Sequence, residues 1–110
     1  MTAPRVELRW WEGCPSWNAA LEMLREEMAA AGHDPRSIVV TEVTSDEHAE
    51  RLGFPGSPTI LVNGTDVQDP GHDPIGLSCR VYRRRDGRVT ALPDPVDVHA
   101  AIARAAGASS

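Results

Sequence analysis

The sequence contains no lysine, only two cysteines and no long run of apolar residues. All 11 basic residues are arginine, a bias typical of a GC-rich bacterial genome that indicates nothing about function. Two cysteines are too few for a disulfide scaffold, so we expect them to be reduced, redox-active or metal-binding. No stretch approaches the roughly 20 apolar residues of a membrane span, and the N-terminal segment lacks the apolar part of a secretory signal. These absences predict a cytoplasmic protein that does not enter a membrane.

The composition is that of one folded domain. Hydrophobic residues make up 41% and charged residues 25% of the 110 residues, which is the balance of a globular protein. A chain of this length supports one modest core, so residues 1–110 are predicted to form a single domain. The net charge of −5 disfavours nonspecific binding to nucleic acid.

The first half of the chain alternates between strand and helix patterns. Apolar and polar residues alternate over 6–11, which predicts a strand, and apolar residues at helical spacing predict a helix over 15–31. The β-branched run at 38–43 predicts a second strand. A capping-box pattern at Thr44 then opens a short helix, which Gly53 ends.

The second half begins with a turn rich in proline and glycine that leads into a strand at 59–62. The stretch 66–76 has the composition of a loop, and 80–83 with 88–91 predict a hairpin around Asp-Gly. Proline after aspartate predicts the start of a last helix at residue 95. This order predicts an α/β fold with a mixed central sheet of about four to five strands, flanked by helices on both faces. An inserted loop and a hairpin precede the last helix.

Two local motifs resemble those of the thioredoxin superfamily. The segment 11–17, Trp-Glu-Gly-Cys-Pro-Ser-Trp, resembles the active-site segment between strand and helix in glutaredoxins and thioredoxins, where Gly-Cys-Pro-x-Cys is common. The segment 57–59, Ser-Pro-Thr, resembles the cis-proline loop that lies beside the active cysteine. The resemblance implies a thioredoxin-like fold and thiol chemistry, and it covers residues 5–64 best.

The resemblance also implies roles for individual residues. It places Cys14 at the active site and predicts a cis bond between Ser57 and Pro58, with the backbone of Ser57 free to pair with an extended substrate. The remaining candidate substrate-binding residues in the two motifs are Trp11, Pro15, Trp17 and Thr59. The sequence departs from the family pattern at Trp17, where the second cysteine of the motif is absent. The usual local dithiol–disulfide cycle is therefore excluded.

The position of Cys14 gives a separate reason to expect reactivity. A cysteine at a helix N-terminus faces unpaired backbone N–H groups and the positive end of the helix dipole, which favour thiolate over thiol. We therefore expect Cys14 to be an exposed thiol with a lowered pKa at the start of the first helix. The alternative is a small, buried apolar residue in the same position.

Cys79 has two interpretations. It could be an inert thiol packed in a strand, because Leu77 and Val81 flank it at alternate positions. It could also be the resolving partner of Cys14, if the preceding loop folds over the Cys14 end of the sheet. Candidate metal ligands near it, Asp69, His72 and Asp73, match no zinc spacing and suit a solvated loop better. Five arginines around the predicted hairpin could attract an anionic ligand or partner, but they suit a solvated strand edge better. They are Arg80, Arg83, Arg84, Arg85 and Arg88.

These observations favour an atypical thiol–disulfide redox protein that acts through Cys14, with Cys79 or an outside thiol as resolving partner. Its substrate would be a thiol or disulfide, on a protein or a small molecule, and neither a cofactor nor a resident metal is implied. Two alternatives stay open. One is soft-metal or organomercury chemistry at two thiolates, as in small proteins labelled alkylmercury-lyase-like. The other is a binding module that has lost the redox cycle.

Overall fold

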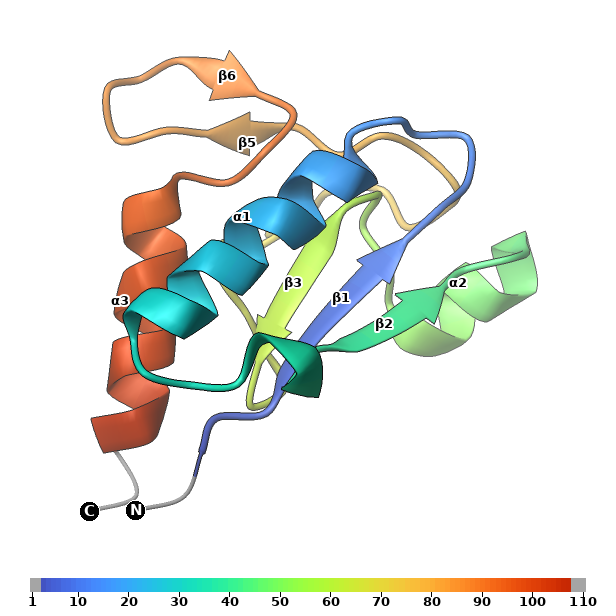
Figure 1. Cartoon of the computed structure of the whole chain (residues 1–110). Coiled ribbons are helices and arrows are strands. Elements are labelled where there is room, and N and C mark those ends of the chain that lie inside the picture. Colours follow the sequence, from blue (N-terminus) through green and yellow to red (C-terminus); the bar gives the residue numbers. More distant parts are fainter. Residues whose placement is uncertain (1–2, 108–110) are drawn as a thin grey trace.

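A computed structural model describes residues 3–107 (Figure 1). Strands and helices alternate in the first half of the chain, and four consecutive strands precede the last helix. In chain order the elements are β1 (Val6–Trp10), α1 (Trp17–Ala30), the 3-10 turn η1 (Pro35–Ser37), β2 (Val39–Glu42), α2 (Asp46–Leu52), β3 (Thr59–Val62), β4 (Thr65–Asp66), β5 (Tyr82–Arg83), β6 (Val89–Thr90) and α3 (Pro95–Gly107). The predicted α/β class is confirmed. Residues 1–2 and 108–110 of the predicted domain lie outside this description. Over the described range, no helix has both the length and the apolar character needed to cross a bilayer.

The central sheet is mixed and has four strands in the order β2-β1-β3-β4. β1 pairs with β2 in parallel, as expected for two strands joined through a helix, and β3 is antiparallel to both β1 and β4. The predicted hairpin is present as β5 and β6, but it forms a separate two-stranded sheet. β4 was not predicted, because a two-residue strand has no detectable period.

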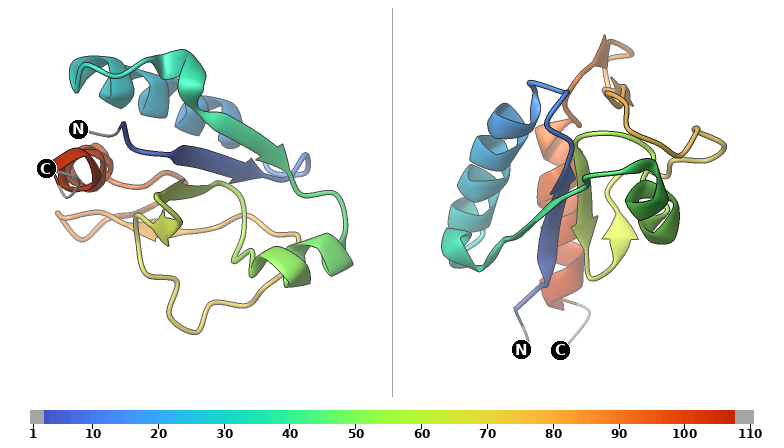
Figure 2. Two further views of the ribbon diagram at one scale, coloured as in Figure 1. Left: turned by 90° about the horizontal axis from the view of Figure 1, so that it is seen from below. Right: turned by 90° about the vertical axis from the view of Figure 1, so that its right-hand side faces the viewer.

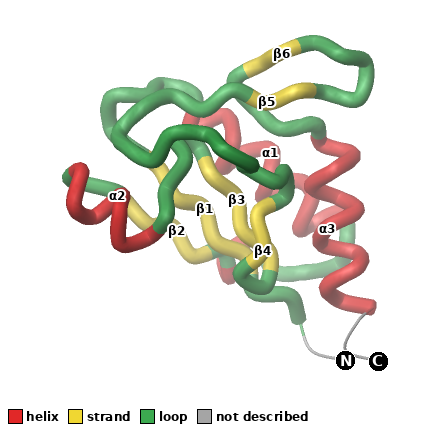
Figure 3. The backbone as a smooth tube through the Cα atoms, turned by 180° about the vertical axis from the view of Figure 1, so that it is seen from behind, coloured by secondary structure: helices red, strands yellow, loops and turns green. Residues whose placement is uncertain are grey.

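Helices cover both faces of the sheet (Figure 2). α1 and α3 lie on one face, and α2 lies on the other, together with the long segment between β4 and β5 (Figure 3). The main core fills the first face, where apolar strand positions meet α1 and α3. Its buried members are Val6, Leu8, Ala20, Leu21, Leu24, Met28, Ile38, Ile60, Val62, Val98, Ala101 and Ile102.

A smaller apolar cluster lies on the second face. Val43, Ala49 and Phe54 are buried in it, and Trp11, Leu52 and Leu77 pack against them. The backbone N–H of Gly76 also donates to the carbonyl of Phe54, at 3.1 Å. The end of the β4–β5 segment is therefore held against the residues that follow α2.

Helix boundaries differ from the predictions at two places that matter for the site. α2 is capped by Ser45 rather than Thr44, because the Ser45 hydroxyl accepts from the backbone N–H of His48 at 3.0 Å. α1 begins at Trp17 and not at residue 15, with Ser16 as its N-cap. Cys14 therefore lies in the turn before the helix rather than in its first turn.

Candidate functional site

Cys14 is buried, with 2% of its surface exposed. Its backbone N–H donates to the carbonyl of Trp11 at 3.1 Å, and this turn directs its thiol toward Ser57. The Trp11 ring lies over Gly13, where an added Cβ would stand 2.3 Å from a ring carbon. The prediction of an exposed thiol is therefore wrong, because the chain turns inward before α1 begins.

The Cys14 thiol has polar partners from two parts of the chain. Its Sγ lies 3.2 Å from the hydroxyl of Ser16 and 3.4 Å from the backbone carbonyl of Ser57, to which it donates. The hydroxyl oxygen of Ser57 accepts from the backbone N–H of Trp11 at 3.0 Å. These contacts bring together segments 11–17 and 57–59, the two motifs that resemble those of the thioredoxin superfamily.

The peptide bond between Ser57 and Pro58 is cis, so that prediction is confirmed. The carbonyl of Pro58 accepts from the hydroxyl of Tyr82, and the Thr59 hydroxyl donates to the carbonyl of Gly56 at 2.7 Å. Ser57, Pro58 and Thr59 are all buried. The cis-proline loop is thus fixed by one hydrogen bond from Tyr82 and by another between its own residues.

The backbone groups of Ser57 are both occupied by another segment of the same chain. Its N–H donates to the carbonyl of Ser78 and its carbonyl accepts from the N–H of Arg80, each at 2.8 Å. Together these bonds form a parallel β-bridge between Ser57 and Cys79. The groups that the family resemblance assigns to a substrate therefore pair with residues 78–80.

This pairing brings Cys79 to Cys14. Cys79 is exposed, and its thiol lies near enough to that of Cys14 for each to shift the pKa of the other, while both cysteines remain free. The expectation that Cys79 is packed in a strand is wrong, because the residue is exposed. The segment that carries Cys79 does lie over the Cys14 end of the sheet, and the role of Cys79 as resolving partner stays a prediction.

The two thiols have opposite electrostatic environments. Burial raises the pKa of Cys14, but hydrogen bonds from the Cys79 thiol, from the Ser16 hydroxyl and backbone, and from the Ser57 side chain outweigh it and lower the pKa below its ordinary value. The hydrogen bond to Cys14 raises the pKa of Cys79, and burial adds to this effect. The two thiols therefore titrate as a pair, in which the surroundings of Cys14 favour the thiolate at that sulfur.

Replacing Ser16 with alanine is expected to raise the pKa of Cys14, because the variant loses a hydroxyl that stabilises the thiolate. The ultraviolet absorbance of the thiolate should then appear at higher pH than in the unmodified protein. Ser37→Ala is a suitable control, since the Ser37 hydroxyl donates to Asp34 on the exposed η1 turn. An unchanged titration in Ser16→Ala would contradict this role.

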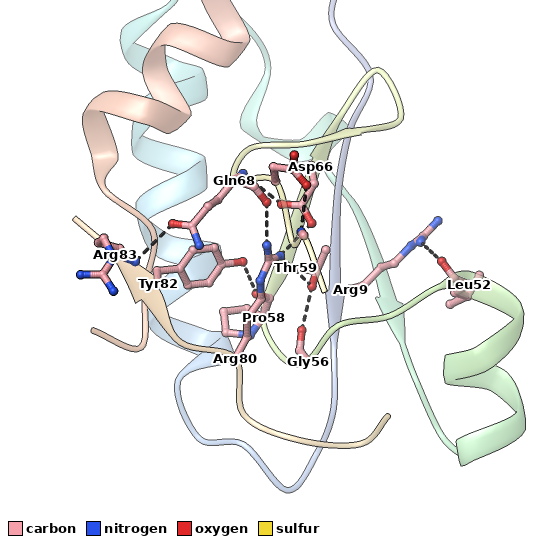
Figure 4. A network of polar contacts seen from close by, with 12 residues as sticks. Arg9, Leu52, Gly56, Pro58, Thr59, Asp66, Gln68, Arg80, Tyr82 and Arg83 are labelled. Carbon is pink, nitrogen blue, oxygen red and sulfur yellow. Dashed lines mark hydrogen bonds and ion pairs between the residues drawn. The ribbon is translucent and has the colours of Figure 1, made fainter. Parts of the chain in front are cut away.

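Arg80 anchors the segment beside Cys79 and was missed by sequence analysis. Its side chain is 1% exposed and lies 2.8 Å from the carboxylate of Asp66. It also donates to the carbonyl of Gln68 at 2.6 Å and to the hydroxyl of Thr59 at 3.3 Å (Figure 4). Its guanidinium lies 4.5 Å from the centre of the Tyr82 ring. The placement of Arg80 on a solvated strand edge is therefore wrong.

The other candidate residues lie around the cysteines with different exposures. Trp17 is half-buried and stacks on Trp10, with ring centres 4.0 Å apart. Trp11 is half-buried as well, and Pro15 is exposed. Pro15 and the partly open faces of the two tryptophans thus remain candidates for contact with a substrate.

Two further features of residues 3–107 do not contribute to the cysteine site. No group of three or more His, Cys, Asp or Glu in this range could hold a metal, so Asp69, His72 and Asp73 do not form a ligand set with Cys79. A hollow of about 450 Å³ lies on the α2 face, between α2, β3 and Pro70, and neither cysteine lines it.

Comparison with known proteins does not assign the site. No family model, curated protein or solved structure matches the chain.

Proposed function

We propose that the protein is a thioredoxin-like thiol–disulfide redox protein whose redox centre is the pair Cys14 and Cys79. The observation that carries the proposal is the bridge between Ser57 and Cys79, which holds Cys79 beside the Cys14 thiol, itself 3.4 Å from the carbonyl of Ser57. The pair replaces the local dithiol that Trp17 makes impossible. Although 79 − 14 = 65 positions separate the cysteines in the sequence, both lie against Ser57 in the fold.

The fold supports the thioredoxin-like part of this proposal. A mixed sheet carries helices on both faces, and a cis-proline loop lies in contact with the cysteine that follows β1. These are the features that the resemblance of segments 11–17 and 57–59 leads one to expect. They support the same class of chemistry, in which a thiolate exchanges with a disulfide.

Formation of the disulfide removes two electrons from the thiol pair and therefore requires an oxidant. With a hydroperoxide, one thiolate attacks the terminal peroxide oxygen to give a sulfenic acid and an alcohol. The second thiol then attacks the sulfenic sulfur and releases water. The balance is two thiols and one hydroperoxide converted to one disulfide, one alcohol and one water. With a disulfide as oxidant, the products are the Cys14–Cys79 disulfide and two outside thiols.

Mild peroxide treatment is expected to reduce the number of free thiols from two to zero while the protein stays a monomer. The reason is that the bridge between Ser57 and Cys79 holds Cys79 beside Cys14. Thiol titration combined with intact mass measurement checks this result. One remaining free thiol beside a sulfenylated Cys14 would contradict the intramolecular pair.

A second function, soft-metal binding, is favoured by the same pairing, because two adjacent thiolates suit a two-coordinate soft cation. Stoichiometric binding of mercuric ion that is lost in both Cys14→Ser and Cys79→Ser, in a protein that forms no disulfide with peroxide, would favour this function. A protein with neither property would be a binding module that retains the fold alone.

A further inference from the structure

The structure exposes Cys79 to outside partners, whereas the sequence indicates Cys14 as the reactive thiol. Cys14 is 2% exposed, and residues 78–80 pair with Ser57 directly beside it. Cys79 is exposed on the solvent side of the same pair. An incoming group therefore reaches the sulfur of Cys79 first.

A peptide substrate cannot pair with Ser57 while the bridge is intact. Both backbone groups of Ser57 are bonded to Ser78 and Arg80, and the anchor of this segment, Arg80, is buried in a polar network with Asp66. Pairing of an extended polypeptide would require these bonds to break. A low-molecular-weight thiol needs no such pairing and requires access to one sulfur only.

We propose that, in the disulfide form, low-molecular-weight thiols attack the sulfur of Cys79 and that Cys14 is the leaving group. This inference rests on the proposed redox pair and reverses the roles expected for its members. It names the substrate class, a small thiol, and the residue that carries the mixed disulfide, Cys79.

The reaction is balanced with two small thiols. A thiolate RS⁻ bonds to the sulfur of Cys79, the bond between Cys79 and Cys14 breaks, and Cys14 leaves with the electron pair as a thiolate. A second RS⁻ then attacks the R sulfur of the mixed disulfide and releases Cys79 as a thiolate, which takes up a proton. The small thiol is oxidised to RSSR and the protein is reduced to two thiols.

The environment of Cys14 suits a leaving group. The hydroxyl of Ser16 lies 3.2 Å from its sulfur and takes no part in the disulfide, so it can donate to the departing thiolate. The exchange is faster when the departing sulfur is better stabilised as a thiolate. Attack in the opposite sense would require the incoming thiolate to reach the sulfur of Cys14, a residue that is only 2% exposed.

The two cysteine variants test this assignment with glutathione disulfide as the probe. In folded Cys14→Ser, we expect Cys79 to gain one glutathione. In folded Cys79→Ser, Cys14 should react about tenfold or more slowly, because its sulfur is covered. In urea, Cys79→Ser should react readily, which shows that the slow reaction comes from the fold. Reaction of folded Cys79→Ser as fast as Cys14→Ser would overturn the proposal.

A measurement on the unmodified chain removes the dependence on variants. The oxidised protein is mixed with glutathione, quenched with acid during reduction, and digested for peptide mass analysis. Glutathione should be found on the peptide that contains Cys79, and its location mainly on Cys14 would overturn the assignment. Failure of the wild-type protein to form an internal disulfide at all would instead contradict the proposed function.

Discussion

Replacing Arg80 with methionine is expected to lower the free energy of unfolding by about 3–5 kcal/mol, because it breaks a buried ion pair from one side. The Arg80 side chain is 1% exposed and that of Asp66 is 12% exposed, so the partner left behind is itself poorly hydrated. Burial raises the pKa of Asp66 even beside Arg80, so the carboxyl is expected to take up a proton more readily once the arginine is gone. Urea denaturation at neutral pH measures the loss.

Two controls separate the effect of burying the ion pair from the effect of losing a charge. Arg88→Ala removes an exposed ion pair with Asp86 in the same part of the chain and should change the stability by less than about 1 kcal/mol. The double variant Arg80→Met with Asp66→Asn should recover part of the loss, because no unpaired carboxylate remains. Equal stability of Arg80→Met and Arg88→Ala would contradict the role of Arg80 as a buried anchor.

Arg80→Met is also expected to slow formation of the internal disulfide. The backbone N–H of Arg80 donates to Ser57, so loss of its side-chain anchor loosens the bridge that aligns Cys79 with Cys14. A displacement of reacting groups by about 1 Å can cost up to about a hundredfold in rate. The measured rate after addition of peroxide should therefore fall while both thiols remain present.

Replacing Gly56 with alanine is expected to expose Cys14 and to lower the stability by about 2–5 kcal/mol. Gly56 has φ +128°, which L residues rarely adopt, and an added Cβ would lie 3.1 Å from the backbone nitrogen and Cβ of Arg80. The collision pushes residues 78–80 away from Ser57. Alkylation of Cys14 in the folded protein should become about tenfold faster or more, as covered thiols become accessible.

Gly53→Ala is the matched control for this prediction. Gly53 also has a positive φ, +64°, but an added Cβ there meets nothing within 4 Å. The variant should lose about 1–2 kcal/mol from backbone strain alone, with no change in the alkylation of Cys14. If Gly56→Ala leaves Cys14 as protected as Gly53→Ala does, residues 78–80 are not what covers the thiol.

Local patterns in the sequence were sufficient for most of the fold. The alternation in β1, the β-branched run of β2 and the apolar β3 each have a period that is visible within a few residues. The cis bond at Pro58 was expected from the resemblance and not from the local pattern. The hairpin was placed correctly because Asp86-Gly87 is a strong turn signal.

The candidate site was predictable only in part. Which cysteine is buried depends on the bridge between Ser57 and Cys79, a contact across 79 − 57 = 22 positions that no local period reports. Arg80 was grouped with the hairpin arginines by sequence proximity, whereas its burial depends on Asp66. The sequence sets Arg80 apart only by its position between Cys79 and Val81, separate from the arginine run at 83–85.

The most direct test of the redox pair is equilibration of the unmodified protein in glutathione buffers of graded redox potential, followed by acid quenching and peptide mass mapping. The account predicts one reversible two-electron transition between two free thiols and a disulfide that links Cys14 to Cys79 within one chain. Two free thiols throughout, or glutathione bound at equilibrium without an internal disulfide, would contradict it.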